Sequence, residues 1–217
     1  MRTIRTKVYQ FSELGEPAKQ KAIEWYRDGN EYIHSGEVLD TIKKGLAQFG
    51  ATLKNYSIDW DNINCSYFAI DLETTDEIEE LEFAIDLETT DEIEELEFAI
   101  DLETTDEIEE LEGVRLWKYL HNNNMLAYWN KYHKKTQNLL AGDCPFTGIC
   151  FDEDFLDNIR KFVKKPDSTT FKELLTDAVY NTINAGCKDW DYINSDEGIE
   201  ESIIANEYEF KADGTRF

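Results

Sequence analysis

A fifteen-residue unit, FAIDLETTDEIEELE, occurs three times in tandem without a single difference, at residues 68–82, 83–97 and 98–112. Each copy carries seven acidic residues and no basic one, so this repeat segment (residues 68–112) contributes −21 of the formal charge of −25. Without two of the copies, 187 residues with a charge of −11 would remain. The repeat segment therefore sets the charge of the chain and interrupts the domain around it.

Within one copy the pattern changes from that of a strand to that of a helix. Residues 68–72 alternate between apolar and other side chains, as in a strand with one buried face. Thr74 and Glu77 then form the spacing of a capping box, and Ile78 and Leu81 share one face of the short helix that would follow. Each copy is therefore predicted to be a strand followed by about two helical turns.

The junctions between copies indicate an insertion. Glu82 runs directly into Phe83 with no Gly, Asn or Pro to end a helix, and only the third copy is followed by a stop signal, Gly113. We therefore interpret residues 83–112 as two extra units inserted into an original domain. One long or broken helix is an alternative, although its apolar residues would not form one face. Disorder of the extra copies is another.

The rest of the chain predicts a single α+β domain over residues 1–217, with a small, mainly antiparallel sheet packed against several helices. Aromatic residues make up 13% of the chain, which is typical of a folded core. Strands are expected at residues 5–11 and in hairpins at 51–72 and 207–217, and helices at 17–27, 37–49, 152–165, 170–183 and 199–205. Residues 114–140 are also expected to be mainly helical.

Composition and charge exclude several classes of function. No run of about 18 apolar residues is present, so we expect no membrane span, and the first eleven residues lack a signal-peptide core. The negative charge would repel phosphates, which argues against direct binding to nucleic acid or to anionic membranes. Four cysteines without a C-x-x-C pair are typical of free thiols in a cytosolic protein.

No sequence motif predicts an enzyme, a metal site or a cofactor. His133 is the only histidine close in sequence to Cys144 and Cys150, and no recognised hydrolase or phosphate-binding motif occurs. Two similar segments, DWDNIN (59–64) and DWDYIN (189–194), could bring four aspartates to a divalent cation. Neither has the glycine and glutamate of a calcium loop, so we interpret their tryptophans as core anchors and their aspartates as turn residues.

Three stretches carry a resemblance to a known group of proteins. They are YQFSELGEPAKQKAIEWYRD (9–28), CPFTGICFDEDFLDNIRKF (144–162) and ANEYEFKADGTRF (205–217). They resemble a family of small acidic, mostly uncharacterised phage and prophage proteins, some of which are called antitoxin-like. The resemblance covers the chain except two of the three copies, and it implies a role in the cytoplasm of a bacterial host cell. It assigns no site residues.

The acidic array of the repeat segment is the candidate site. Its carboxylates would imitate the phosphates of a nucleic acid and occupy the Lys/Arg groove of a basic or nucleic-acid-binding host protein. The predicted array consists of Asp71, Glu73, Asp76, Glu77, Glu79, Glu80, Asp86, Glu88, Asp91, Glu92, Glu94, Glu95, Asp101, Glu103, Asp106, Glu107, Glu109 and Glu110. A solvated face that only keeps the protein soluble is the alternative interpretation. The one notable basic cluster, Lys131, His133, Lys134 and Lys135, is expected to be an exposed helix face or an internal partner of the array.

The predicted function is therefore non-enzymatic binding and inhibition of a host factor, for example a defence protein. An antitoxin-like protein that neutralises a toxin through a specific interface is the first alternative. A metal-dependent enzyme is the second. A triplication that is engineered or without function, on a domain whose role lies elsewhere, is the third.

Overall fold

The computed structural model describes residues 7–29, 34–61, 63–72, 108–130, 134–141 and 144–217. Within these ranges the chain has six α-helices and three antiparallel sheets of two strands each, which confirms the α+β class. The sequence predicted one small sheet, and this was wrong for the described strands, because helices separate each pair from the next. The predicted strand–helix unit lies outside the described residues except at its two ends, 68–72 and 108–112.

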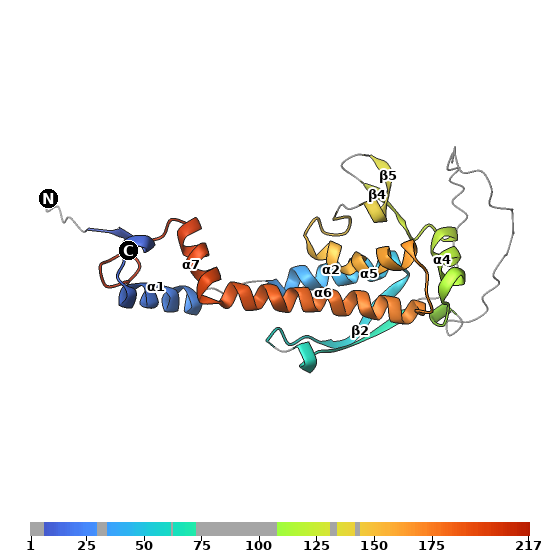
Figure 1. Ribbon diagram of the computed structural model, residues 1–217, viewed down its shortest axis with the longest axis horizontal. Helices are drawn as coiled ribbons and strands as arrows, with labels where there is room; N and C mark the ends of the chain where they lie inside the picture. The colour runs from blue at the N-terminus through green and yellow to red at the C-terminus, as the bar shows by residue number, and fades with distance from the viewer. Residues whose placement is uncertain (1–6, 30–33, 62, 73–107, 131–133, 142–143) are drawn as a thin grey trace.

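The two ends of the chain fold together at one end of the molecule (Figure 1). The elements are β1 (Tyr9–Gln10), the 3₁₀ turn η1 (Phe11–Glu13), α1 (Glu16–Gly29), α7 (Asp196–Ala205) and β6 (Glu209–Phe210). Strand β1 pairs with β6, so that Tyr9 lies opposite Phe210. Their buried side chains form a separate cluster, the terminal core: Phe11, Leu14, Ala18, Ala22, Ile23, Ile199, Ile203 and Phe210.

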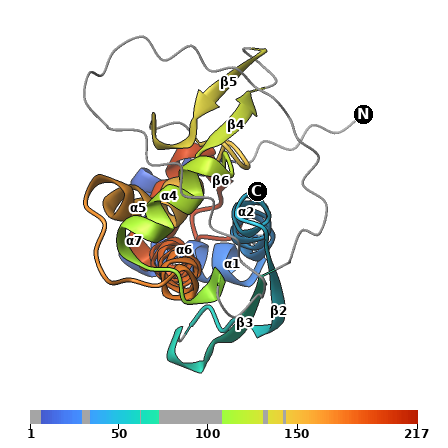
Figure 2. The same ribbon diagram turned by 90° about the vertical axis from the view of Figure 1, so that its right-hand side faces the viewer.

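A larger cluster, the main core, lies at the other end. Its elements are α2 (His34–Gln48), β2 (Ala51–Ser57), the 3₁₀ turn η2 (Ile63–Cys65), β3 (Tyr67–Leu72), α4 (Gly113–Asn122), α5 (Phe151–Lys164) and α6 (Phe171–Asn194). The apolar residues of α2 recur every three or four positions, and Val38, Ile42 and Leu46 are all completely buried. Helices α2, α5 and α6 pack on one another (Figure 2), and the β2–β3 pair extends along α6 (Figure 1).

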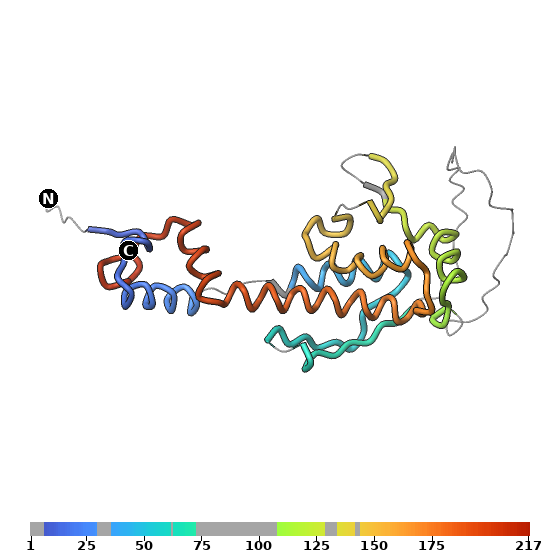
Figure 3. The backbone as a smooth tube through the Cα atoms, in the orientation of Figure 1, coloured from blue at the N-terminus to red at the C-terminus, as the bar shows by residue number. Residues whose placement is uncertain are grey.

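Helix α6 connects the two ends of the molecule (Figure 3). It begins at a capping box in which Glu173 N donates to Thr170 Oγ1 at 3.2 Å and Thr170 N donates to Glu173 Oε2 at 3.0 Å. Thr170 was among the residues predicted to open this helix. The buried residues of α6 belong to the main core, whereas the next helix, α7, contributes to the terminal core. The prediction of one domain over residues 1–217 stays a prediction.

The helical prediction for residues 125–140 was wrong. This stretch contains β4 (Ala127–Asn130) and β5 (Lys135–Asn138), an antiparallel pair, followed by the 3₁₀ turn η3 (Leu139–Ala141). Asn124 and Lys134 have positive φ angles of 51° and 49°, which a helix interior excludes. The Gln48 Nε2 group donates to the carbonyl oxygens of Met125 and Ala127, each at 3.0 Å, and so fixes the start of the pair to the end of α2.

Two strand predictions near the chain ends were also inaccurate. The strand predicted at residues 5–11 is only Tyr9–Gln10 in the described part, because Gln10 N donates to Glu13 Oε2 at 2.9 Å and the chain turns into η1. The predicted C-terminal hairpin is short, with one bridge between Phe210 and Arg216, and Phe210 also pairs with Tyr9 of β1. Its turn is present, and Gly214 has the positive φ, 82°, that favours glycine.

Candidate functional site

Both ends of the repeat segment are anchored in the main core. At the first end, β3 pairs with β2 in the register Leu53 to Ile70 and Ala51 to Leu72, and Leu72 is buried. At the second end, Leu111 is 2% exposed, and its carbonyl oxygen accepts a hydrogen bond from Phe171 N at 2.8 Å. Figure 1 shows both ends at the end of the molecule where α4 lies.

These two anchors come from different copies. Residues 68–72 are the first five residues of the first copy, and residues 108–112 are the last five of the third. Joined by the five intervening residues, ETTDE, they would make one complete unit. The connection between them contains 35 residues, 73–107, which is five residues plus two copies of fifteen. The insertion of two units stays a prediction, and the two anchors show which residues of a unit enter the main core.

Only three members of the predicted acidic array lie in the described residues. Asp71 is exposed on β3, opposite Thr52, and Glu110 is exposed. Glu109 pairs with Lys172 Nζ at 2.5 Å, so this carboxylate is engaged with α6. The other fifteen predicted members lie outside the described residues: Glu73, Asp76, Glu77, Glu79, Glu80, Asp86, Glu88, Asp91, Glu92, Glu94, Glu95, Asp101, Glu103, Asp106 and Glu107.

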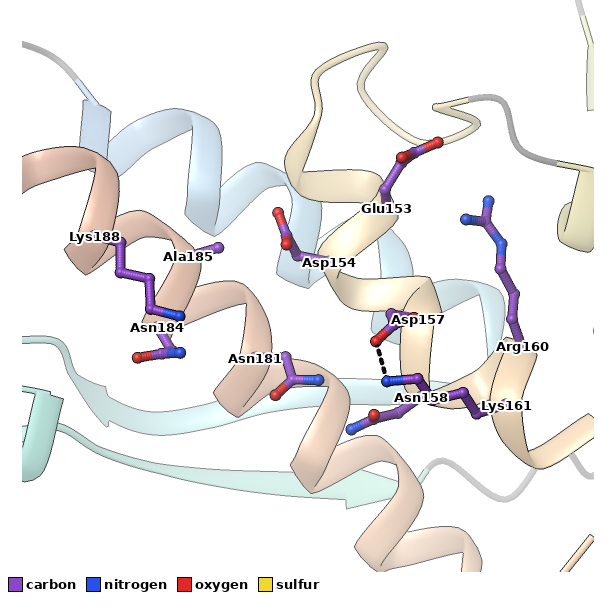
Figure 4. Close-up of a pocket in the computed structure, with 10 residues that line it drawn as sticks. All are labelled: Glu153, Asp154, Asp157, Asn158, Arg160, Lys161, Asn181, Asn184, Ala185 and Lys188. Carbon is purple, nitrogen blue, oxygen red and sulfur yellow. Dashed lines mark hydrogen bonds and ion pairs between the residues drawn. The ribbon is translucent and has the colours of Figure 1, made fainter. Parts of the chain in front are cut away.

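A polar groove of about 600 Å³ lies between α5 and α6 (Figure 4). Asp154 and Asp157 lie on the side of α5 that faces α6, whereas Glu153 and Arg160 point away from that helix. The groove is lined by Glu153, Asp154, Asp157, Asn158, Arg160, Lys161, Asn181, Asn184, Ala185 and Lys188. The sequence did not predict this groove, although the i, i+3, i+7 spacing of Asn181, Asn184 and Lys188 places them on one face of a helix.

The charges of the groove are largely compensated internally. Burial raises the pKa of the Asp154 carboxyl, the charges of Asp157 and Glu153 raise it further, and the ammonium group of Lys188 lowers it. Asp157 in turn pairs with Lys161 at 2.6 Å. The groove contains no Ser, Thr, Cys or His, and its carboxylate, amide and cationic side chains offer hydrogen bonds to a polar ligand.

The two segments DWDNIN (59–64) and DWDYIN (189–194) meet in the structure through their side chains. Trp190 Nε1 donates to Asp61 Oδ1 at 2.9 Å, and the ring of Trp60 lies so close to Gly186 that a Cβ there would stand 2.8 Å from it. The second segment is the last part of α6 and not a turn, and at its end the side-chain amide Asn194 Nδ2 donates to the Trp190 carbonyl oxygen. Among the described residues, no three acidic, thiol or imidazole groups are placed to hold a metal ion.

The loop before α5 is built around the buried carboxylate of Asp152. Its Oδ2 accepts hydrogen bonds from the backbone N–H groups of Phe146, Thr147 and Gly148 at 2.8–3.2 Å, and its Oδ1 accepts from the hydroxyls of Thr41 and Thr147. These five hydrogen bonds give Asp152 a structural role in fixing the loop to α2.

Cys144, in the same loop, lies in surroundings that disfavour its ionised form. Burial raises the pKa of the Cys144 thiol, and the charges of Asp152 and Glu153 raise it further, which disfavours the thiolate. His133, the predicted base, lies outside the described residues, as does Lys131 of the basic cluster. Lys134 and Lys135 of that cluster are exposed at the β4–β5 turn rather than on a helix.

No protein-family model, no curated protein and no solved structure matches this chain. In the part of the chain that the structure describes, every helix is too short or too polar to cross a lipid bilayer.

Proposed function

We propose that this protein acts by non-covalent binding, and that its acidic array engages a basic surface of a host protein in the bacterial cytoplasm. The partner is a nucleic-acid-binding factor, such as a defence enzyme, whose Lys/Arg groove the carboxylates occupy in place of phosphates. The resemblance to phage and prophage proteins supports this setting. The observation that carries the proposal is the concentration of 21 carboxylates and no basic residue in the 45 residues of the repeat segment.

The two anchors support the proposal because they join the acidic segment to the fold at both of its ends. Leu72 and Leu111 are buried in the main core, so both ends of the segment are fixed to a folded body. Of the three array members that the structure describes, only Glu109 is paired with a basic side chain, and Asp71 is exposed. Outside the repeat segment the formal charge is only −4, so the body has no large excess of positive charge to neutralise the array.

Polyanion mimicry predicts a characteristic dependence on salt. A groove that contacts about six phosphates of DNA loses on the order of a thousandfold in affinity between 50 and 200 mM salt. A mimic in the same groove should show the same direction of change, because the interaction is between exposed charges. DNA should also compete with the protein for the partner.

The test captures proteins from a bacterial lysate on the immobilised full chain at 50 mM NaCl and elutes them with either 500 mM NaCl or duplex DNA. In the test variant, the fourteen acidic residues of copies two and three are changed to Gln or Asn. In a control variant, Glu24→Gln and Glu197→Gln neutralise two exposed acids outside the repeat segment. We expect the full chain to capture nucleic-acid-binding proteins, and duplex DNA to release them. The control variant should still capture these proteins, whereas the test variant should not. Equal retention by the test variant would contradict the proposal.

An antitoxin-like interface is the second candidate, and it is favoured by apolar side chains exposed near the terminal core. Tyr192, Ile204 and Phe217 are 45%, 55% and 63% exposed. A toxin bound there would be held mainly by apolar contact, so its capture should persist at 500 mM NaCl and fall with Ile204→Asp. If the test variant loses this capture and the Ile204→Asp variant keeps it, the antitoxin-like interface is excluded.

A further inference from the structure

Five polar side chains of the groove between α5 and α6 are left without a partner in the described part of the protein. Asp154 and Asn158 line the groove from α5, and Asn181, Asn184 and Lys188 line it from α6 (Figure 4). Within the described residues, none of these five side chains makes a hydrogen bond or an ion pair with another protein group. The groove therefore presents one carboxylate, one ammonium group and three carboxamides whose hydrogen-bonding capacity the described protein groups leave unused.

The three groove asparagines differ from the asparagines at helix ends. Asn158 lies in the interior of α5, and Asn181 and Asn184 lie in the interior of α6, where asparagine is a poorer helix former than alanine, leucine or lysine. At the helix ends, Asn194 and Asn206 each donate to the backbone carbonyl oxygen four residues earlier. The groove asparagines make no such bond, and all three are only partly exposed. Their carboxamides are thus available to a ligand that lies between the two helices.

The two charges of the groove that remain unpaired have opposite sign. Asp157 and Lys161 are already joined as an ion pair. Burial raises the pKa of the Asp154 carboxyl, and the neighbouring acidic side chains raise it further, whereas the Lys188 ammonium group lowers it. Asp154 and Lys188 therefore attract each other, although no ion pair joins them in the described structure. A molecule that carries both an ammonium group and a carboxylate would satisfy both of them.

The composition of the lining narrows the class of ligand further. The lining holds three acidic and three basic residues, so it has no net charge that would favour an ion of one sign. Among the lining residues that the structure describes, Ala185 is the only apolar one and none is aromatic, so the groove offers no stacking surface for a nucleobase. A carboxamide both donates and accepts, which suits a ligand side chain that does the same, an amide or a hydroxyl. A groove of about 600 Å³ is large enough for a small molecule of this kind.

We propose that the groove between α5 and α6 binds a small zwitterion, an α-amino acid with an amide or hydroxyl side chain. Its ammonium group pairs with Asp154, and its carboxylate pairs with Lys188. Its side chain exchanges hydrogen bonds with the carboxamides of Asn158, Asn181 and Asn184. The site uses no residue of the repeat segment, so this inference is independent of the proposed function.

The first test titrates the full chain with L-glutamine, L-asparagine, L-serine and L-threonine, each up to about 20 mM, and follows the backbone amide shifts of α5 and α6 by nuclear magnetic resonance. We expect saturable shifts with at least one of the four and a Kd below about 1 mM. For the amino acid that binds best, the analogue without the carboxylate and the analogue without the ammonium group should each bind at least about tenfold more weakly, because each leaves one charge of the groove unpaired. The absence of saturable shifts with all four, or equal binding of an analogue that lacks one charge, would overturn the proposal.

The second test changes one carboxamide and one charge of the groove. Asn184→Ala removes a carboxamide and introduces a better helix former, so α6 should be kept, and Lys188→Met removes the ammonium group from an exposed position. The matched controls, Asp177→Ala and Lys164→Met, change exposed residues of α6 and α5 outside the groove. With circular dichroism confirming that each variant is folded, we expect both groove variants to weaken binding at least about tenfold and both controls to bind as the native chain does. Groove variants that bind as tightly as the controls would show that the ligand lies elsewhere and would refute the assignment.

Discussion

Deletion of residues 83–112 should leave a folded and more stable protein. In the shortened chain Ile78 and Leu81 take the places of Ile108 and Leu111, and five residues connect the strand to the second anchor instead of 35. Those five residues span at most about 20 Å. The closure entropy of a flexible connection scales as 1.5 RT ln n, so shortening it from 35 to five residues stabilises the folded state by about 1.7 kcal/mol.

The charge change adds to this effect at low salt. The deletion reduces the formal charge from −25 to −11, which weakens repulsion within the compact state. At 0.5 M NaCl this electrostatic part is screened, and the part due to loop closure remains. The assay is urea unfolding of both chains, followed by circular dichroism, at 0.05 and 0.5 M NaCl. We expect a gain of about 1.7 kcal/mol at high salt and a larger one at low salt. Loss of cooperative unfolding, or a shortened chain less stable than the full one, would refute the interpretation of residues 83–112 as an insertion.

Three further predictions concern single residues of the body. Burial raises the pKa of Asp154, which opposes folding at neutral pH, so Asp154→Asn should stabilise the protein by a few tenths of a kcal/mol at pH 7, with the gain vanishing below about pH 4. A hydrogen bond from Lys21 lowers the pKa of Asp213. The stability that the ionised Asp213 carboxyl contributes is therefore present above about pH 4 and is lost as the pH falls further. Asp213→Asn should therefore be less stable than the native chain at pH 7 and should approach it in acid, as a pH series of thermal melts would show. Gly214→Ala would place a Cβ 2.1 Å from the Ala18 carbonyl oxygen at a φ of 82°, and should cost about 3 kcal/mol in urea unfolding; a cost under about 1 kcal/mol would contradict the geometry.

The parts of the fold that the sequence predicted are those in which local pattern and burial agree. The stripe Val38, Ile42, Leu46 in α2 is completely buried, because its spacing matches the helical repeat. Residues 51–72 form the expected antiparallel pair, since their alternation matches the period of a strand. The start of α6 at Thr170 was within the predicted range, because the capping box there is a local signal.

The failures occur where distant contacts decide the structure. Residues 125–140 have apolar side chains at spacings that also suit a helix, and it is Gln48, far away in sequence, whose two hydrogen bonds hold the start of β4. The groove between α5 and α6 was missed for the same reason, because it exists only where two helices pack side by side. The DW segments were expected to be alike, yet one ends a helix and the other does not, although they meet through Trp190 and Asp61.

The two anchors also allow the repeat segment to vary in length. Pairing with β2 takes the first five residues of a copy, and the second anchor takes the last five, so any whole number of copies presents the same residues to the core. Copies added or removed between the two anchors leave Leu72 and Leu111 in place. Each added copy changes the charge by −7 while leaving both anchors as they are. If the proposed function holds, the strength of binding to a basic partner can therefore be tuned by copy number, at a cost to folding that grows only with the logarithm of the connection length.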